Sequence, residues 1–174
     1  MSTLARFPQI MSLILITALT FQTQIEAQTP AQDKKAIKAQ HIKTIIDSQN
    51  FVFKVQSATP MSGRTRNLTS DYDLTITTAA ITSYLPYFGR AYTAPIDPSQ
   101  GGLNFTSKNF DYKAEPRKKD GWDISIKPKD YRDVQQMILT VSSSGYGTLQ
   151  VTSTSRQPIS FYGYVTDIKN KKKS

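Results

Sequence analysis

The sequence predicts a single α+β domain that is mainly β, with an N-terminal amphipathic helix packed on a curved antiparallel sheet that forms a partial sandwich or half-barrel. Residues 28–168 have the length of one domain and contain no internal repeat. One helical stretch lies near the N-terminus. Every later apolar pattern repeats at every second residue, which is typical of antiparallel strands with one buried face.

Residues 1–27 have the pattern of a secretory signal peptide. Arg6 precedes an apolar run from Ile10 to Ile16, and Ala27 supplies the small residue before the expected cut. The run is too short for a membrane span, although an uncleaved anchor is the alternative. The chain has no cysteine, which excludes a lipoprotein anchor, disulfides and thiolate metal sites. We therefore expect an exported protein, periplasmic or extracellular, whose mature chain has no transmembrane span.

The helix is predicted to begin at Pro30, with Thr29 as its cap, and to end near Ser48. Its apolar stripe must lie on another apolar surface. The stripe consists of Ile37, His41, Ile42, Ile45 and Ile46. The lysines fall mostly off this stripe, and they are Lys34, Lys35, Lys38 and Lys43.

Strands are predicted wherever apolar and polar residues alternate. They cover residues 51–56, 72–77, 81–85, 110–114, 122–127, 137–141, 149–151 and 159–165. The glycine-bearing stretch Ser142–Gly147 predicts a hairpin turn between two of them. Two long connections, residues 94–102 and 128–133, are rich in turn formers. The basic tail, residues 169–174, is expected to be disordered.

The stretch from Tyr84 to Tyr92, called the aromatic segment below, holds four of the seventeen Phe and Tyr residues of the chain. Pro86 ends the preceding strand at Leu85, and Gly89 allows a tight bend. Two interpretations stay open. The segment is either an aromatic plug at one end of a β core or a ligand site in which Arg90 contacts an anion or stacks on the ligand.

Three stretches together resemble one family of bacterial proteins. They are the aromatic segment followed by Ala94-Pro95, then Gly101–Phe105 with Asp111-Tyr112-Lys113, and last Arg156–Tyr164. Their order and spacing are similar to those of the domain of unknown function 4251 family, over most of the mature chain. The resemblance implies an exported protein of mostly β structure. It implies no activity and no catalytic residue.

The sequence is poor in catalytic residues. The single histidine, His41, lies on the apolar stripe of the helix, which makes a Ser-His-Asp triad unattractive. Asp71 and Asp73 could bind calcium, but a solvated strand face is the favoured explanation. Asp97 and Asp111 flank the glycine-rich loop and provide the minimum for a carboxylate-based hydrolase. We expect no catalytic residue, no bound metal and no cofactor.

A non-enzymatic binding module for an amphipathic or anionic ligand, a glycan or a lipid, agrees best with these features. The net charge of +9 and the aromatic residues interleaved with basic ones favour such ligands, whereas export makes nucleic acid an unexpected partner. A structural or protein-interaction component of the bacterial envelope is the alternative, and a hydrolase is the third. The sequence does not determine the oligomeric state. The candidate binding residues are Tyr84, Tyr87, Phe88, Arg90, Tyr92, Tyr162 and Tyr164.

Overall fold

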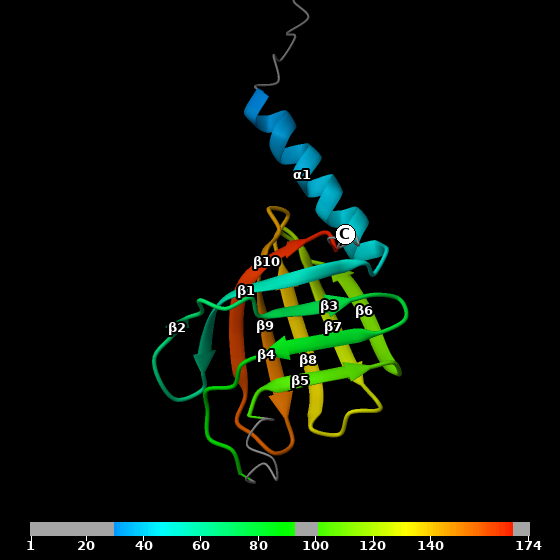
Figure 1. Cartoon of the computed structure of the whole chain (residues 1–174). Helices are drawn as coiled ribbons and strands as arrows, with labels where there is room; N and C mark the ends of the chain where they lie inside the picture. Colours follow the sequence, from blue (N-terminus) through cyan, green and yellow to red (C-terminus); the bar gives the residue numbers. More distant parts are fainter. Residues whose placement is uncertain (1–29, 93–100, 169–174) are drawn as a thin grey trace, which may run out of the picture.

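The computed structural model describes residues 30–92 and 101–168, which form one helix and ten strands (Figure 1). The helix is α1 (Pro30–Asp47). The strands are β1 (Phe51–Pro60), β2 (Arg66–Asn67), β3 (Asp73–Ile76), β4 (Ile81–Leu85), β5 (Leu103–Ser107), β6 (Phe110–Pro116), β7 (Trp122–Pro128), β8 (Val134–Val141), β9 (Tyr146–Ser153) and β10 (Ile159–Thr166). Residues 28–174 therefore contain every described element.

The strands form one antiparallel sheet that curls into a nearly closed barrel. Their order is β5-β4-β3-β1-β10-β9-β8-β7-β6, and the short β2 pairs with β1. The two end strands, β5 and β6, follow each other in the chain, so Lys108 and Asn109 join the two edges of the sheet. Asp130 holds this corner because its carboxylate accepts hydrogen bonds from the backbone N–H groups of both residues, at 2.8 and 3.1 Å.

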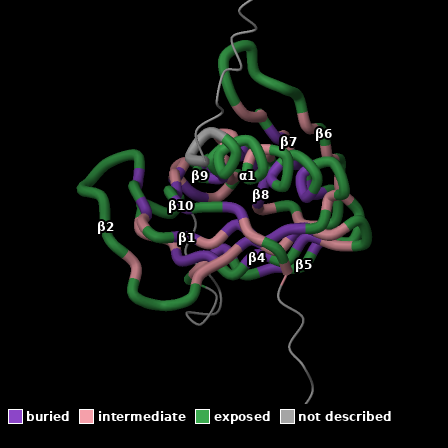
Figure 2. The backbone as a smooth tube through the Cα atoms, turned by 90° about the horizontal axis from the view of Figure 1, so that it is seen from above, coloured by how far each residue is buried: buried purple, intermediate pink, exposed green. Residues whose placement is uncertain are grey.

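Alternate residues of each strand fill the interior of the barrel. In β4, for example, Ile81 and Leu85 are fully buried, whereas Tyr84 is half exposed. Viewed from above, the buried positions gather inside the ring of strands (Figure 2). Burying apolar area of this kind contributes about 25 cal/mol per Å², which makes the barrel interior the main source of stability. The largest fully buried side chains include Phe51, Phe53, Phe161, Ile46, Leu74 and Met137.

The helix has the predicted extent, but it does not lie along the sheet. Ile42, Ile45 and Ile46 are buried at one end of the barrel, whereas Ile37 is 69% exposed. Figure 1 shows the N-terminal part of α1 pointing away from the barrel. The predicted stripe was therefore wrong at its N-terminal end, where Ile37 and His41 are both exposed.

Helix geometry explains this correction. Ile42, Ile45 and Ile46 define the packing face. Lys38 and Lys35 stand on the same face about one and two turns earlier, four and seven residues before Ile42. Lysines are almost never fully buried, so the part of the helix that contains them, before Ile42, has to lie away from the barrel. Two of the lysines that were expected off the apolar stripe, Lys35 and Lys38, thus lie on the same helix face as the buried isoleucines.

The last turn of α1 is fixed to the barrel by specific contacts. The Tyr112 hydroxyl on β6 donates a hydrogen bond to the Ile46 carbonyl at 3.0 Å. Gln49 adopts a left-handed conformation, with φ of 50°, and the N–H of Asn50 reaches back to the Ile45 carbonyl at 3.2 Å. This is the Schellman pattern, in which glycine is the usual residue at the left-handed position. The helix therefore stops sharply and the chain turns into β1.

The predicted strands are confirmed, including the β8–β9 hairpin, in which Leu139 faces Leu149 and Met137 faces Val151. Two strands were missed. The two-residue β2 is too short to show a pattern. In β5, Leu103, Phe105 and Ser107 are buried in alternation, but the glycines before it made the region look like a loop. Part of the first predicted connection, residues 94–100, lies outside the described residues, as do residues 1–29 and the tail.

The barrel has two ends with different character. The helix pole carries α1, the β8–β9 turn and the β6–β7 connection, where the N–H of Ser143 donates to Asp120. The opposite end, called the loop pole below, is formed by the β1–β2 loop, the aromatic segment, and the β7–β8 and β9–β10 connections. The aromatic segment is thus one of four loops that meet at the same end of the barrel.

Candidate functional site

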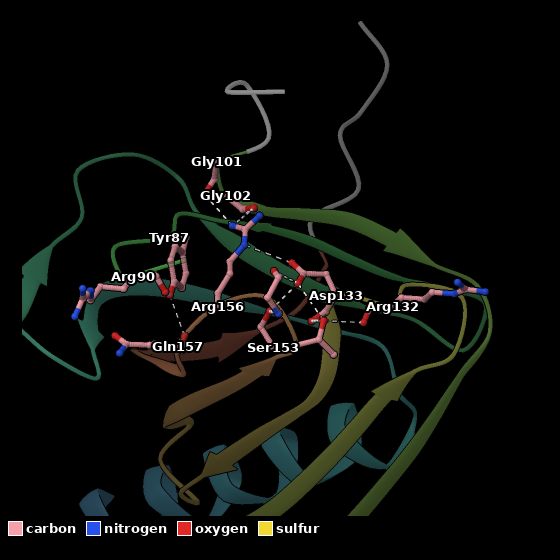
Figure 3. A network of polar contacts seen from close by, with 11 residues as sticks. Tyr87, Arg90, Gly101, Gly102, Arg132, Asp133, Ser153, Arg156 and Gln157 are labelled. Atoms are coloured by element: carbon pink, nitrogen blue, oxygen red, sulfur yellow. Dashed lines mark hydrogen bonds and ion pairs between the residues drawn. The ribbon is translucent and has the colours of Figure 1, made fainter. Parts of the chain in front are cut away.

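The aromatic segment begins as predicted, with β4 ending at Leu85 and Pro86 buried just beyond it. Tyr87 then turns inward. Its hydroxyl lies 2.9 Å from the Arg90 carbonyl and 3.0 Å from the Gln157 carbonyl, and it donates its single proton to this pair (Figure 3). The Tyr87 hydroxyl thereby ties the bend of its own segment to the β9–β10 connection. The plug interpretation accordingly describes the surroundings of this residue.

Arg156 lies at the centre of the same network and is only 7% exposed. Its guanidinium stands 5.2 Å from the centre of the Tyr87 ring and donates hydrogen bonds to the carbonyls of Gly101 and Gly102, both at 3.0 Å. It also forms an ion pair with Asp133, at 3.4 Å. One buried cation therefore connects four segments of the loop pole.

Asp133 is the counterion of this cation. Burial alone would raise the pKa of its carboxyl, but hydrogen bonds from Ser155 and Ser153, together with the charge of Arg156, lower that pKa below its usual value. The Ser153 hydroxyl donates at 2.8 Å. Burial also raises the pKa of Tyr87, so its hydroxyl stays protonated as a donor. Among the described residues no buried side-chain nitrogen or oxygen lacks a hydrogen-bond partner, which is typical of a structural junction.

Sequence analysis predicted no role for Arg156 on its own. A single arginine between two serines and a proline looks like a surface residue, because arginine is rarely buried without a partner. The partner, Asp133, lies in another predicted connection. One signal could have revealed the pair. Asp133 lies in the β7–β8 connection and Arg156 in the β9–β10 connection, and these two connections meet at the same end of the sheet because β8 and β9 are neighbours.

A second cluster of aromatic side chains lies on the outer face of the barrel. Tyr146 on β9 stacks on Tyr162 of β10 with ring centres 6.1 Å apart, and it meets Tyr164 edge-on at the same distance. All three rings are exposed, at 38–48%. Further along this face, Tyr84 stacks on Tyr72 at 5.4 Å. These outward positions follow from strand alternation, since their chain neighbours point into the core.

The strand register places most of these side chains in one row. Tyr146 faces Tyr164, Tyr164 faces Lys54, Lys54 faces Asp73, and Asp73 faces Tyr84. We call this line the outer row. With strands about 4.8 Å apart, Tyr84 lies about 14 Å from Tyr164 and about 19 Å from Tyr146 along the sheet. The row is therefore long enough to contact an extended ligand at several points.

A groove of about 570 Å³ runs beside the middle of the outer row. Lys54 and Asp73 form an ion pair across it, at 2.6 Å. The charged residues of its lining are one cation and three carboxylates, so the groove is locally acidic although the whole chain is basic. A second hollow of about 300 Å³ borders the Tyr72–Tyr84 stack. The groove is lined by Val52, Lys54, Asp71, Asp73, Thr75, Tyr164, Thr166, Asp167 and Ile168.

The seven residues predicted to bind a ligand do not form a single site. Tyr84 and Tyr164 belong to the outer row and Tyr162 stacks beside it, whereas the other four lie at the loop pole. There Tyr87 is half-buried in the network around Arg156, and Phe88 is half-buried beneath the Arg66 guanidinium at 5.0 Å. Arg90 and Tyr92 are exposed. Lys54 and Tyr146 were not among the predicted residues, because the sequence does not show which strands are neighbours in the sheet.

The residues considered for catalysis and metal binding are dispersed. His41 is half exposed and bonds to Asp167 at 2.9 Å. Asp111 is on the exposed face of β6, in an ion pair with Lys129 at 2.5 Å, and Asp97 lies outside the described residues. Asp71 and Asp73 border the groove. Within residues 30–92 and 101–168, no three His, Cys, Asp or Glu side chains are grouped to hold a metal ion.

Three comparisons relate this chain to known proteins. The sequence profile of the family described as Domain of unknown function (DUF4251) matches residues 33–165. A crystal structure of a DUF4251 family protein from Bacteroides eggerthii DSM 20697 is similar in fold, with a TM-score of 0.56 and 15% identity over 78% of this chain and 91% of that one. No curated protein matches. No helix in the described ranges is long and apolar enough to cross a membrane.

Proposed function

This chain belongs to the DUF4251 family, and from that premise we propose that it is an exported, non-enzymatic carbohydrate-binding module that holds a glycan along the outer row. The observation that carries the proposal is the line of exposed tyrosines that flanks a polar groove. Tyr84 marks one end of the line, and Tyr164 with Tyr146 marks the other. Lys54 and Asp73 lie between them.

The chemistry of the outer row suits sugars. Flat tyrosine rings offer apolar faces against which the C–H groups of a pyranose can pack, and each carries a hydroxyl that can donate and accept. Sugar hydroxyls need both donors and acceptors at close range. Lys54 supplies donors, Asp71 and Asp73 supply acceptors, and the hydroxyl of Thr75 can act as either.

The local charge selects among glycans. With three carboxylates against one cation, the groove attracts amino-bearing sugars, carries no charge penalty for neutral ones and disfavours acidic ones, despite the +9 charge of the chain. A fatty acid would meet the same repulsion. An anionic ligand or a lipid is therefore less compatible with this groove than a neutral glycan, which narrows the ligand class predicted from the sequence.

Export is the second part of the proposal, and it is supported by Arg6, the apolar run from Ile10 to Ile16, and Ala27. Mass spectrometry of the protein recovered from a fractionated bacterial host tests it directly. A mature mass that begins at Gln28, found in the periplasmic or external fraction, supports export. An intact chain in the cytoplasmic fraction contradicts it.

Calorimetric titration of residues 28–174 with a panel of neutral, amino-bearing and acidic oligosaccharides tests the binding function. Tyr164→Ala and Tyr84→Ala should each weaken binding of a neutral or amino-bearing glycan about 5- to 30-fold, because a central aromatic contact contributes about 1–2 kcal/mol. Tyr92→Ala is the matched control, since Tyr92 is exposed but lies away from the row. The proposal fails if no such glycan binds, or if the control weakens binding as much as the two row variants.

An envelope scaffold that binds another protein is the second candidate, and the openness of the tyrosine cluster favours it. Tyr146, Tyr162 and Tyr164 stand on a convex barrel surface, and exposed tyrosines are common in protein interfaces. If the glycan panel gives no binding, crosslinking in the bacterial envelope from a photoreactive residue at position 162 would identify such a partner.

A further inference from the structure

The loop pole carries a surface on which exposed arginines alternate with apolar side chains, of which Met61 and Tyr92 are exposed and Phe88 is half-buried. We call it the arginine patch. It is formed by the β1–β2 loop, β2 and the end of the aromatic segment, and it is separate from the outer row and its groove. Its members are Met61, Arg64, Arg66, Phe88, Arg90 and Tyr92.

Hydrogen bonds bring the two halves of the patch together on either side of the β9–β10 connection. The N–H of Met61 donates to the Pro158 carbonyl at 3.3 Å, and the N–H of Tyr92 donates to the Ser155 carbonyl at 2.7 Å. The Arg66 guanidinium lies 5.0 Å from the centre of the Phe88 ring and so links the halves directly. Figure 3 shows the Arg90 side chain pointing out of the buried network.

The patch is positive because its two parent stretches contain no acidic residue. No Asp or Glu occurs from residue 48 to residue 70, or from residue 74 to residue 96. Arg64, Arg66 and Arg90 are exposed, and in the part of the chain that the structure describes no carboxylate forms an ion pair with any of them. Their charge is therefore available to an external anion.

The apolar members of the patch are unusually exposed. Met61, at the start of the β1–β2 loop, is 71% exposed, and Tyr92 is 68% exposed. A flexible thioether and a tyrosine beside arginines are the combination found at the boundary between lipid headgroups and acyl chains, where tyrosine is enriched and arginine binds phosphate. A soluble anion would use the arginines but would leave Met61 in water.

We propose that the arginine patch docks the barrel on an anionic phospholipid surface, with Arg64, Arg66 and Arg90 on the headgroup phosphates and with Met61 and Tyr92 entering the interface. An acidic polysaccharide is the competing partner. The exposed methionine decides against it, because a polysaccharide offers no apolar layer to cover that side chain. Docked in this way, the barrel would hold its helix pole away from the lipid.

Sedimentation of residues 28–174 with vesicles tests the proposal. This mature form is used because it lacks the apolar run before Ala27, which could bind lipid by itself. The vesicles contain either phosphatidylcholine alone or phosphatidylcholine with 30% phosphatidylglycerol. Binding is expected only to the anionic vesicles. Arg64→Gln with Arg90→Gln should lower the partition coefficient about 30-fold, because each basic residue near the surface contributes about fivefold. Met61→Ser should also lower the partition coefficient, and this loss should persist at a salt concentration that screens the charges, because it removes an apolar contact.

The matched control removes the same charge from the other end of the molecule. Lys34→Gln with Lys35→Gln, on the exposed part of α1, should leave lipid binding nearly unchanged. Equal loss in the two double variants would reduce the effect to net charge and overturn the proposal. Absence of lipid binding, or binding to an acidic polysaccharide in place of anionic vesicles, would also overturn it. Circular dichroism of each variant confirms that the fold is intact.

Discussion

Replacing Tyr87 by phenylalanine separates the structural role of the aromatic segment from a binding role. The change removes one hydroxyl that serves two carbonyls. The Arg90 carbonyl keeps a bond from the N–H of Gln157 at 3.0 Å, so the Gln157 carbonyl alone loses the donor described for it. A lost hydrogen bond costs about 1 kcal/mol, and a half-buried carbonyl without a partner adds up to about 1 kcal/mol more. We expect a destabilisation of about 1–2 kcal/mol.

Differential scanning calorimetry of residues 28–174 measures this loss. For a domain of this size, 1–2 kcal/mol corresponds to a decrease in Tm of very roughly 3–8 °C. Tyr92→Phe is the control, because its side chain is 68% exposed and its Tm should stay within about 2 °C of the wild type. If Tyr87→Phe kept the wild-type Tm and instead weakened ligand binding, the hydroxyl would belong to a site and the structural assignment would be wrong.

Three further predictions follow from the fold. The pKa of Asp133 is lower in the folded chain than in the unfolded one, so Asp133 should stabilise the protein above about pH 4 and lose this contribution as the pH falls through the lowered pKa. Asp133→Asn should therefore lower the free energy of unfolding by about 1–3 kcal/mol at pH 7. In urea unfolding measured at several pH values, the variant should lose less stability than the wild type as the pH falls. Gly163→Ala should prevent the β1–β10 pairing, since the new Cβ would lie 2.0 Å from the Lys54 carbonyl oxygen, and we expect insoluble or unfolded protein by circular dichroism. Ile46→Ala should cost about 2–5 kcal/mol by thermal unfolding, whereas Ile37→Ala should change stability by less than about 0.5 kcal/mol.

The strands were predictable because alternation is a local signal. In β10, Phe161 is buried and Tyr162 and Tyr164 are exposed, and the sequence placed them on these opposite faces. The helix stripe failed because its spacing alone does not say where the supporting surface ends, and only the isoleucines of the last turns reach the barrel.

The sites were less predictable because they depend on strand order. Tyr84 and Tyr164 were both named as candidate binding residues, but the row that joins them passes through Lys54 and Asp73 on two intervening strands. Nothing in the local sequence reveals that β1 lies between β3 and β10. The pair of Arg156 and Asp133 was missed for a different reason. The predicted β8–β9 hairpin already brings its members together, with Val134 opposite Ser153, but an arginine in a connection looks like a surface residue.

The position of β10 next to β1 also governs when the protein can fold. Strands from the two ends of the domain pair in the middle of the sheet, with Val52 opposite Thr166, so the sheet stays split until translation has delivered the last strand. Pairing of segments that are so distant in the sequence is slow, and β1 has no β10 to pair with until the last strand has been synthesised. A nascent chain with this topology stays open throughout synthesis, the condition in which a polypeptide can still be threaded through a translocation channel. A ribosome that stops before β10 releases a chain with two bare sheet edges, on β1 and β9, and such a fragment is a substrate for aggregation and proteolysis.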